Sequence, residues 1–73
     1  MDIRYLQSFV AVVELGSFRE AAYVLNISQP ALSRRIQKLE EILRVQLLDR
    51  TTRQVSLSTV GRNFFPRARH LVG

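Results

Sequence analysis

Three residues, Asn26-Ile27-Ser28, separate two stretches of the chain in which apolar residues recur at helical spacing. The apolar residues are Phe18, Ala21, Ala22 and Leu25 in the first stretch and Leu32, Ile36, Leu39 and Leu43 in the second. Ser17 opens a capping-box sequence before the first stretch, and Ser28 is a good N-cap for the second, whose first turn tolerates Pro30. The spacing therefore predicts two helices joined by a very short turn.

The segments on either side predict one more helix and a small hairpin. Apolar residues recur at helical spacing from residue 3 to residue 13, and Gly16 follows as a natural stop. After the second of the two stretches the helical period fails. Residues 46–50 and 54–57 then resemble two short strands joined by the polar residues 51–53. This pattern predicts a β-hairpin behind three helices.

The last part of the chain predicts a final helix. Ser58 or Thr59 can cap it, and Pro66 removes one backbone hydrogen bond and is expected to kink it. The elements together predict a mainly α fold with a three-helix core, a short β-hairpin and a last helix, in which the two central helices follow the helix-turn-helix plan. We expect residues 1–58 to form one domain and residues 59–73 to form the last helix.

The charge of the chain is concentrated in its second half. Residues 1–43 hold five basic and five acidic side chains, whereas residues 44–73 hold six arginines and only one acid, Asp49. Ten of the eleven basic residues are arginine, whose planar fork matches phosphate groups and guanine edges better than lysine does. This asymmetry indicates a polyanionic partner and favours nucleic acid.

The second of the two central helices carries side chains suited to reading DNA. In a helix-turn-helix, this helix enters the major groove with its N-terminus first. Gln29 can bond to adenine, Arg34 to guanine, and Ser33 to several base edges. Such residues are also common on a solvated helix face, so chemistry alone leaves that alternative open.

These residues also form a wider pattern that resembles the N-terminal DNA-binding domain of the LysR-type transcriptional regulators. The matching positions are Ala21-Ala22, Leu25, Ser28-Gln29-Pro30-Ala31-Leu32-Ser33-Arg34, Ile36, Leu39-Glu40, Leu47, Arg50, Leu57 and Gly61. The resemblance covers essentially the whole chain. It implies a winged helix-turn-helix fold, in which the β-hairpin is the wing and residues 59–73 form the linker helix. It also implies sequence-specific binding to double-stranded DNA by a bacterial, cytoplasmic, nucleoid-associated protein.

The resemblance also assigns roles to individual residues. The base-reading positions fall on Gln29, Pro30, Ser33 and Arg34. We expect contacts to the DNA backbone or the minor groove from Ser28, Arg35, Lys38, Arg50, Thr51 and Arg53. The alternative for the hairpin arginines is a solvated rim with Asp49 as a local partner, and Thr51 can equally be an ordinary turn residue.

Two positions depart from the family pattern. Arg44 stands where a glycine commonly ends the recognition helix, and Leu48 stands where phenylalanine is frequent. A non-glycine residue adopts the left-handed conformation at such a helix end at a cost of about 1 kcal/mol, which a cation near the helix C-terminus partly offsets. The sequence therefore does not predict how the recognition helix and the wing are oriented relative to each other.

The last helix resembles the linker through which two such domains dimerise. The predicted contact residues are Phe64, Phe65, Ala68, Leu71 and Val72. The alternative is that these side chains pack back on Phe9 or Val13 of the same chain. A homodimer would place two recognition helices on an inverted repeat, and a tetramer can form in the full-length protein.

Other functions fit the sequence less well. No cysteine, one histidine and no clustered acids leave neither a catalytic triad nor a set of metal ligands, so we expect no enzyme activity. One alternative is an interaction module that docks its basic last helix on an acidic protein, and such a module would bind DNA without sequence preference. A second alternative, membrane binding, is disfavoured because the last helix is short and is interrupted by Pro66. We expect no cofactor in this chain, because the family binds its small-molecule effector in a downstream domain.

Overall fold

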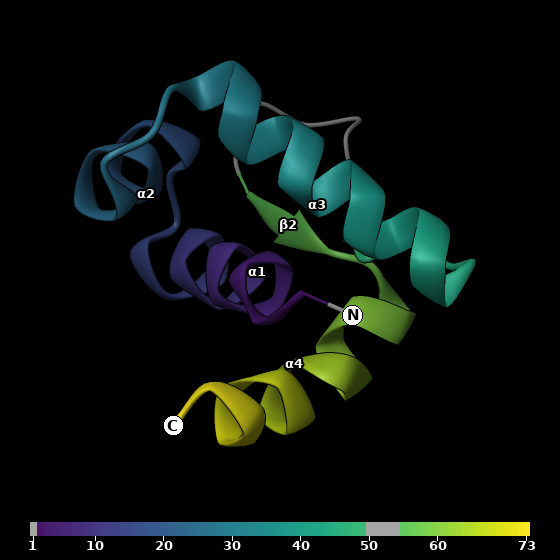
Figure 1. The fold of residues 1–73 in the computed structure, drawn as a ribbon. Helices are drawn as coiled ribbons and strands as arrows, with labels where there is room; N and C mark the ends of the chain where they lie inside the picture. Colours follow the sequence, from purple (N-terminus) through teal and green to yellow (C-terminus); the bar gives the residue numbers. More distant parts are fainter. Residues whose placement is uncertain (1, 50–54) are drawn as a thin grey trace.

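The computed structural model describes residues 2–49 and 55–73, which form four helices and two short strands (Figure 1). In chain order these elements are α1 (Ile3–Leu15), α2 (Phe18–Leu25), α3 (Gln29–Leu43), β1 (Leu48–Asp49), β2 (Ser56–Leu57) and α4 (Thr59–Val72). The predicted order of three helices, a hairpin and a last helix is confirmed, and with it the mainly α, winged helix-turn-helix fold.

Serine side chains begin three of these helices, as the sequence predicts. The hydroxyl oxygens of Ser17, Ser28 and Ser58 accept hydrogen bonds from the backbone amides of Glu20, Ala31 and Gly61. Each bond satisfies one of the amides that the first turn of a helix leaves without an intrahelical partner. Ser58, rather than Thr59, is therefore the cap of α4.

Left-handed residues end the first three helices. Gly16, Asn26 and Arg44 have φ angles of 66°, 60° and 58°. Arg44 thus has the left-handed conformation that is expected at the end of the recognition helix, although glycine is the common residue at this position in the family. Its amide is bonded to the carbonyl groups of Glu40 and Glu41.

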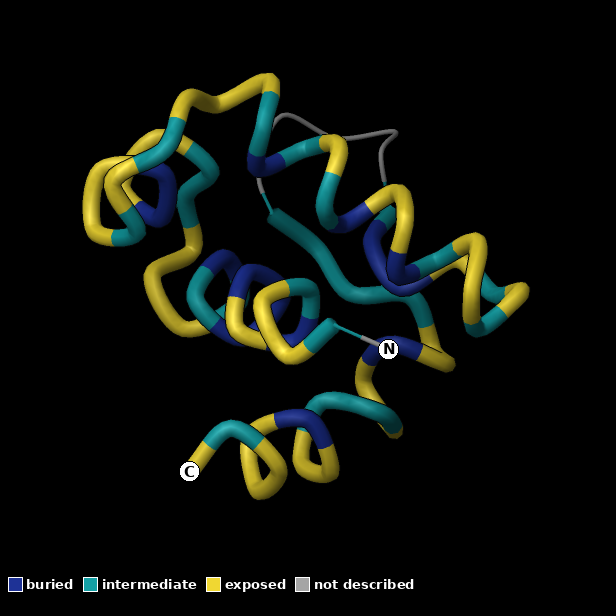
Figure 2. The backbone as a smooth tube through the Cα atoms, in the orientation of Figure 1, coloured by how far each residue is buried: buried dark blue, intermediate teal, exposed yellow. Residues whose placement is uncertain are grey.

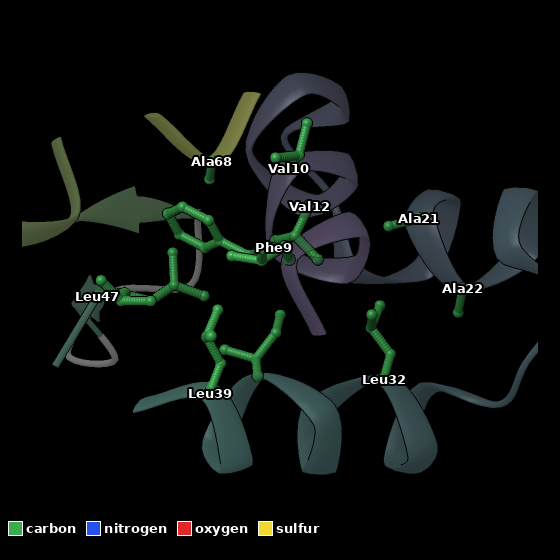
Figure 3. Packing of buried hydrophobic residues seen from close by; sticks show 12 residues of the cluster. Phe9, Val10, Val12, Ala21, Ala22, Leu32, Leu39, Leu47 and Ala68 are labelled. Atoms are coloured by element: carbon green, nitrogen blue, oxygen red, sulfur yellow. The ribbon is translucent and has the colours of Figure 1, made fainter. Parts of the chain in front are cut away.

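The hydrophobic core gathers around α1, which contacts α2, α3 and α4 (Figures 1 and 2). The largest fully buried apolar side chains are Phe9 and Val12 from α1, Leu32, Ile36 and Leu39 from α3, and Leu47. Figure 3 shows Phe9 directed from α1 into the space between Leu39, Leu47 and Ala68. The core thus fixes the orientation of α3 relative to the rest of the chain.

The hairpin is shorter than the sequence predicts. Its antiparallel ladder pairs Leu48 with Leu57 and Asp49 with Ser56. The sequence predicts strands over residues 46–50 and 54–57. The structure corrects this prediction, because Gln46, Leu47 and Val55 lie outside the strands. The ends of these predicted strands nearest the turn lie outside the described residues.

Leu47 comes just before β1, and α3 takes its backbone amide. Its amide donates to the Glu40 carboxylate at 2.7 Å, and its carbonyl oxygen accepts from the amide of Ser58 at 2.9 Å. The amide is therefore satisfied by α3, and the carbonyl is satisfied by Ser58, the residue opposite Leu47 in the register of the hairpin. The side chain of Leu47 is fully buried at the same point.

α4 packs along α1 of the same chain. The ring of Phe9 lies 5.9 Å from that of Phe64 and 6.2 Å from that of Phe65, measured between centroids. The alternative that these aromatic side chains pack back on Phe9 is thus confirmed. Ala68 is fully buried in the chain's own core and offers no surface to a partner, whereas Leu71 is 62% exposed.

Pro66 lies inside α4, which continues to Val72. The kink predicted at this residue stays a prediction. Among the described residues, no helix is both long enough and apolar enough to cross a membrane.

Candidate nucleic-acid interface

The turn between α2 and α3 is closed by its own backbone. The amide of Asn26 donates to the carbonyl of Tyr23 at 3.1 Å, and the amide of Ile27 donates to that of Ala22 at 3.0 Å. Asn26 takes the left-handed conformation that asparagine tolerates better than most residues. The turn is thus held at a defined angle, and α3 starts beside α2 and runs across α1 (Figure 1).

The start of α3 presents the four predicted base-reading residues on one face. Gln29, Pro30 and Arg34 are exposed and Ser33 is half-buried, whereas Leu32 between them is fully buried. Residues three and four apart share a face of a helix, so these side chains point to the same side. A polar face at the N-terminal end of this helix has the geometry needed to reach base edges in a major groove.

Basic residues adjoin this face along α3. Arg35 is half-buried and Lys38 is exposed, and both border, with Arg34, an open cavity of about 310 Å³ between α3 and the start of α1. Ser28 is exposed, and its oxygen accepts from the Ala31 amide, which leaves its hydroxyl proton for an outside acceptor. The three predicted backbone-contact residues of α3 and its cap therefore remain available to phosphate.

A charged pair that the sequence did not single out closes the other side of this cavity. The Arg4 guanidinium donates to both oxygens of the Asp2 carboxylate, with Nη2 2.7 Å from Oδ2 and Nε 3.1 Å from Oδ1. These hydrogen bonds lower the pKa of Asp2 from 3.8 to about 2, with a smaller contribution from the charge of Arg35. Asp2 raises the pKa of Arg4 in return, so both side chains stay charged at neutral pH.

The wing is described only in part. The predicted contact residues Arg50, Thr51 and Arg53 lie outside the described residues. Asp49, which precedes them, is half-buried in the ladder opposite Ser56. The role of the wing residues stays a prediction.

Residues 3–62 match the sequence profile of the family described as "Bacterial regulatory helix-turn-helix protein, lysR family". This chain belongs to the LysR family. The match covers the three core helices, the hairpin and the start of α4, and it confirms the resemblance seen in the sequence. The chain is accordingly a DNA-binding helix-turn-helix domain of a LysR-type transcriptional regulator.

Individual relatives agree with the family. The chain is 54% identical over 71 residues to the SDS degradation transcriptional activation protein of Pseudomonas sp. (strain ATCC 19151), covering 97% of the chain and 23% of that protein. It is 52% identical over 68 residues to the regulator BenM of Acinetobacter baylyi, covering 93% of the chain and 22% of BenM. The chain thus spans under a quarter of these two LysR-family regulators.

Solved structures show the same fold. The crystal structure described as the BenM_DBD/benA site 1 DNA complex superposes with a TM-score of 0.93 at 50% identity, covering 99% of this chain and 81% of that one. Full-length BenM in its R156H mutant superposes with a TM-score of 0.93, and the match covers 24% of its chain. The LysR-type fold is therefore shared over nearly the whole of this chain.

The sequence identifies Glu40 only as part of the family pattern and does not predict that it connects the recognition helix of this LysR-type domain to its wing. Glu40 lies on α3, and its Oε2 atom accepts hydrogen bonds from the amides of Leu47 at 2.7 Å and Leu48 at 3.2 Å. The sequence signal is the position of Glu40 directly after the buried Leu39, which turns its side chain toward the edge of the core. Glu40 and Leu47 are seven residues apart in the sequence. The sequence does not show how the chain turns between them, so the hydrogen bond could not be inferred from the position of Glu40 alone.

Proposed function

We propose that this LysR-type domain reads double-stranded DNA by placing the N-terminal half of α3 in the major groove. The observation that carries the proposal is the shared face of Gln29, Pro30, Ser33 and Arg34 on a helix whose other side is anchored in the core. The side chains on this face supply amide, hydroxyl and guanidinium groups for base edges. Arg35 and Lys38 flank them with positive charge for the phosphates.

We further propose that two copies bind an inverted repeat. Near its C-terminus, α4 carries the exposed Leu71 and the half-buried Val72. An open hollow beside them is lined by Phe65, Pro66 and Arg69. The exposed apolar surface at this end of the domain supports a contact between the α4 helices of two copies. Phe65 is half-buried against Phe9, so only part of its side chain is available to the second copy. A two-fold dimer would then place two α3 helices in successive major grooves.

The remaining expectations belong to the whole regulator. We propose that a small-molecule effector binds elsewhere in the full-length protein, which acts on DNA in the bacterial cytoplasm and nucleoid. The two LysR-family relatives compared above are over four times as long as the matched segment, which supports a division of labour between domains.

The test is fluorescence anisotropy of the chain with the benA site 1 duplex and with a scrambled duplex of the same composition. Both titrations are run between about 50 and 200 mM salt, a range over which an affinity that depends on phosphate contacts falls by orders of magnitude. We expect the benA duplex to bind more tightly, with a preference that survives at the higher salt. Equal affinity for both duplexes at every salt concentration would leave only electrostatics and contradict base reading by α3.

A parallel sedimentation experiment tests the dimer. With the chain in excess over two molar equivalents, the duplex should sediment as one complex that holds two chains per inverted repeat. A complex with one chain at saturating protein would contradict the dimer and leave base reading by a monomer. The alternative function, docking on an acidic protein, predicts no preference between the two duplexes.

A further inference from the structure

We propose that the cavity between the start of α1 and the middle of α3 binds a phosphodiester group of the DNA backbone, with Arg4 as its outer contact. This inference deepens the proposed function and rests on it. The residues that line the cavity are Asp2, Arg4, Tyr5, Ala31, Arg34, Arg35 and Lys38. We refer to these residues as the α1–α3 cavity.

The charge of the α1–α3 cavity favours an anion. Four basic side chains border it, from two different helices, against the single carboxylate of Asp2. The cavity has a volume of about 310 Å³ and is open to solvent. A concave surface with an excess of guanidinium and ammonium groups is suited to phosphate, which accepts several charge-assisted hydrogen bonds at once.

The position of the cavity on α3 fits the path of a DNA strand. Ala31, Arg35 and Lys38 recur at helical spacing, so they lie on one face of α3, beside the face that carries Gln29 and Ser33. A helix that reads a major groove has a phosphate backbone on each side of it. The face next to the base-reading residues is therefore the one that meets a backbone, and the start of α1 lies against it.

The Asp2 carboxylate holds Arg4 in place for this contact. Arg4 bonds to Asp2 through the Nε and Nη2 side of its planar fork, which leaves its Nη1 side available to a second acceptor. The Arg4 side chain is still 64% exposed. Asp2 also accepts from the Arg4 amide at 2.9 Å as the N-cap of α1, so the carboxylate is fixed to the helix from which Arg4 projects.

The same carboxylate weakens the cavity for an anion. Its negative charge is bonded to Arg4 and lies near Arg35, so a phosphate that binds there approaches a like charge. Asp2 thus orients Arg4 and at the same time limits how strongly the cavity holds DNA of any sequence.

The experiment compares Arg4→Ala with Arg67→Ala in the anisotropy titrations described above. Arg67 is exposed on α4 and does not line the cavity, so its loss controls for the net charge of the chain. We expect Arg4→Ala to bind both duplexes roughly two- to fivefold more weakly, the range of an exposed charge contact. The slope of log affinity against log salt should fall by about one unit in Arg4→Ala and less in Arg67→Ala.

Asp2→Asn supplies the opposite change. Asparagine caps a helix about as well as aspartate, so α1 should be kept, and circular dichroism melts check that both α1 variants stay folded. The amide oxygen that Asp2→Asn introduces can still accept from Arg4, so this variant removes the negative charge and keeps an acceptor for the guanidinium. We expect Asp2→Asn to bind both duplexes more tightly than the unmodified chain, whereas binding no tighter than the unmodified chain would overturn the role of Asp2. If the unmodified chain binds duplex but Arg4→Ala loses no more than Arg67→Ala, the cavity is no phosphate site and the proposed function stands. If the unmodified chain binds neither duplex, both proposals fail.

Discussion

The Glu40 carboxylate on α3 accepts a hydrogen bond from the backbone amide of Leu47, with Oε2 and N 2.7 Å apart. The neighbouring amide of Leu48 donates to the same oxygen at 3.2 Å. Leu48 is the first residue of β1, so the recognition helix and the wing share this one carboxylate. The connection explains how α3 and the hairpin keep a fixed relation although Arg44 replaces the usual glycine between them.

We expect Glu40→Ala to lower the free energy of unfolding by about 1–3 kcal/mol, because two partly buried amides lose their shared acceptor. Urea denaturation followed by circular dichroism measures the change. Glu41→Ala is the matched control, since Glu41 is the exposed neighbour on the same helix. Equal losses in the two variants would mean that the bond to Leu47 adds nothing to the stability of the domain.

Of the three glycines, Gly61 is the one that has no room for a Cβ atom. A Cβ atom at this residue would lie 2.0 Å from the carbonyl oxygen of Leu47, which is backbone and is itself bonded to Ser58. Gly→Ala inside a helix usually stabilises it by about 0.5–1 kcal/mol, but here we expect a loss of about 1–3 kcal/mol from the overlap.

Thermal melts of Gly61→Ala against Asn63→Ala decide the sign. Asn63 is exposed on the same helix, where alanine should stabilise α4 by a few tenths of a kcal/mol through its higher helix propensity. A melting temperature for Gly61→Ala that equals or exceeds that of Asn63→Ala would be incompatible with the close approach to Leu47.

Arg44→Gly should stabilise the domain. Arg44 ends α3 with a φ angle of 58°, a conformation that glycine adopts without the steric cost of a Cβ atom. We expect a gain of up to about 1 kcal/mol, reduced by the loss of a cation at the helix C-terminus. Arg44→Ala removes the same cation and keeps the strain, so it should be less stable than both, and urea titrations of the three chains would show that order.

The charged pair at the start of α1 predicts a pH dependence. Hydrogen bonds from Arg4 hold the pKa of Asp2 at about 2, below its ordinary value of 3.8. Because the folded value is the lower one, the stabilisation from this pair is complete above pH 3.8 and disappears as the pH falls through 2. Carboxyl NMR shifts of Asp2 report the titration, which should move up toward 3.8 in Arg4→Ala. An unchanged midpoint in that variant would assign the shift to another cause.

Base reading and backbone binding should respond differently to mutation. We expect Gln29→Ala and Ser33→Ala to reduce the ratio of affinities for the benA and scrambled duplexes, since a good base contact contributes about 1–3 kcal/mol of discrimination. Arg53→Ala should weaken binding to both duplexes alike and lower the salt slope by about one unit. The same loss of preference in all three variants would argue against separate roles for α3 and the wing.

The sequence by itself determined where α2 and α3 begin and where α1 and α2 end, and it limited the cap of α4 to two residues. Ser17, Ser28 and Ser58 cap helices through an amide three residues further on, and Gly16 and Asn26 end them in the left-handed conformation. These interactions depend on side chains and backbone within a few residues, so short-range chemistry is enough to predict them. The face of α3 that carries Gln29 and Ser33 follows in the same way from helical periodicity.

Only the tertiary structure decided what the apolar residues of α4 contact and where the strands stop. From the sequence alone, Phe64 and Phe65 could have packed against a partner helix. They pack against Phe9 instead, because the path of the chain brings residues 9 and 64 close together. Leu47 fits the strand pattern, but its backbone amide is bonded to the Glu40 carboxylate and not to the opposite strand. In each case the deciding partner is distant in sequence, and a local pattern carries no information about which distant group will be near enough to bond.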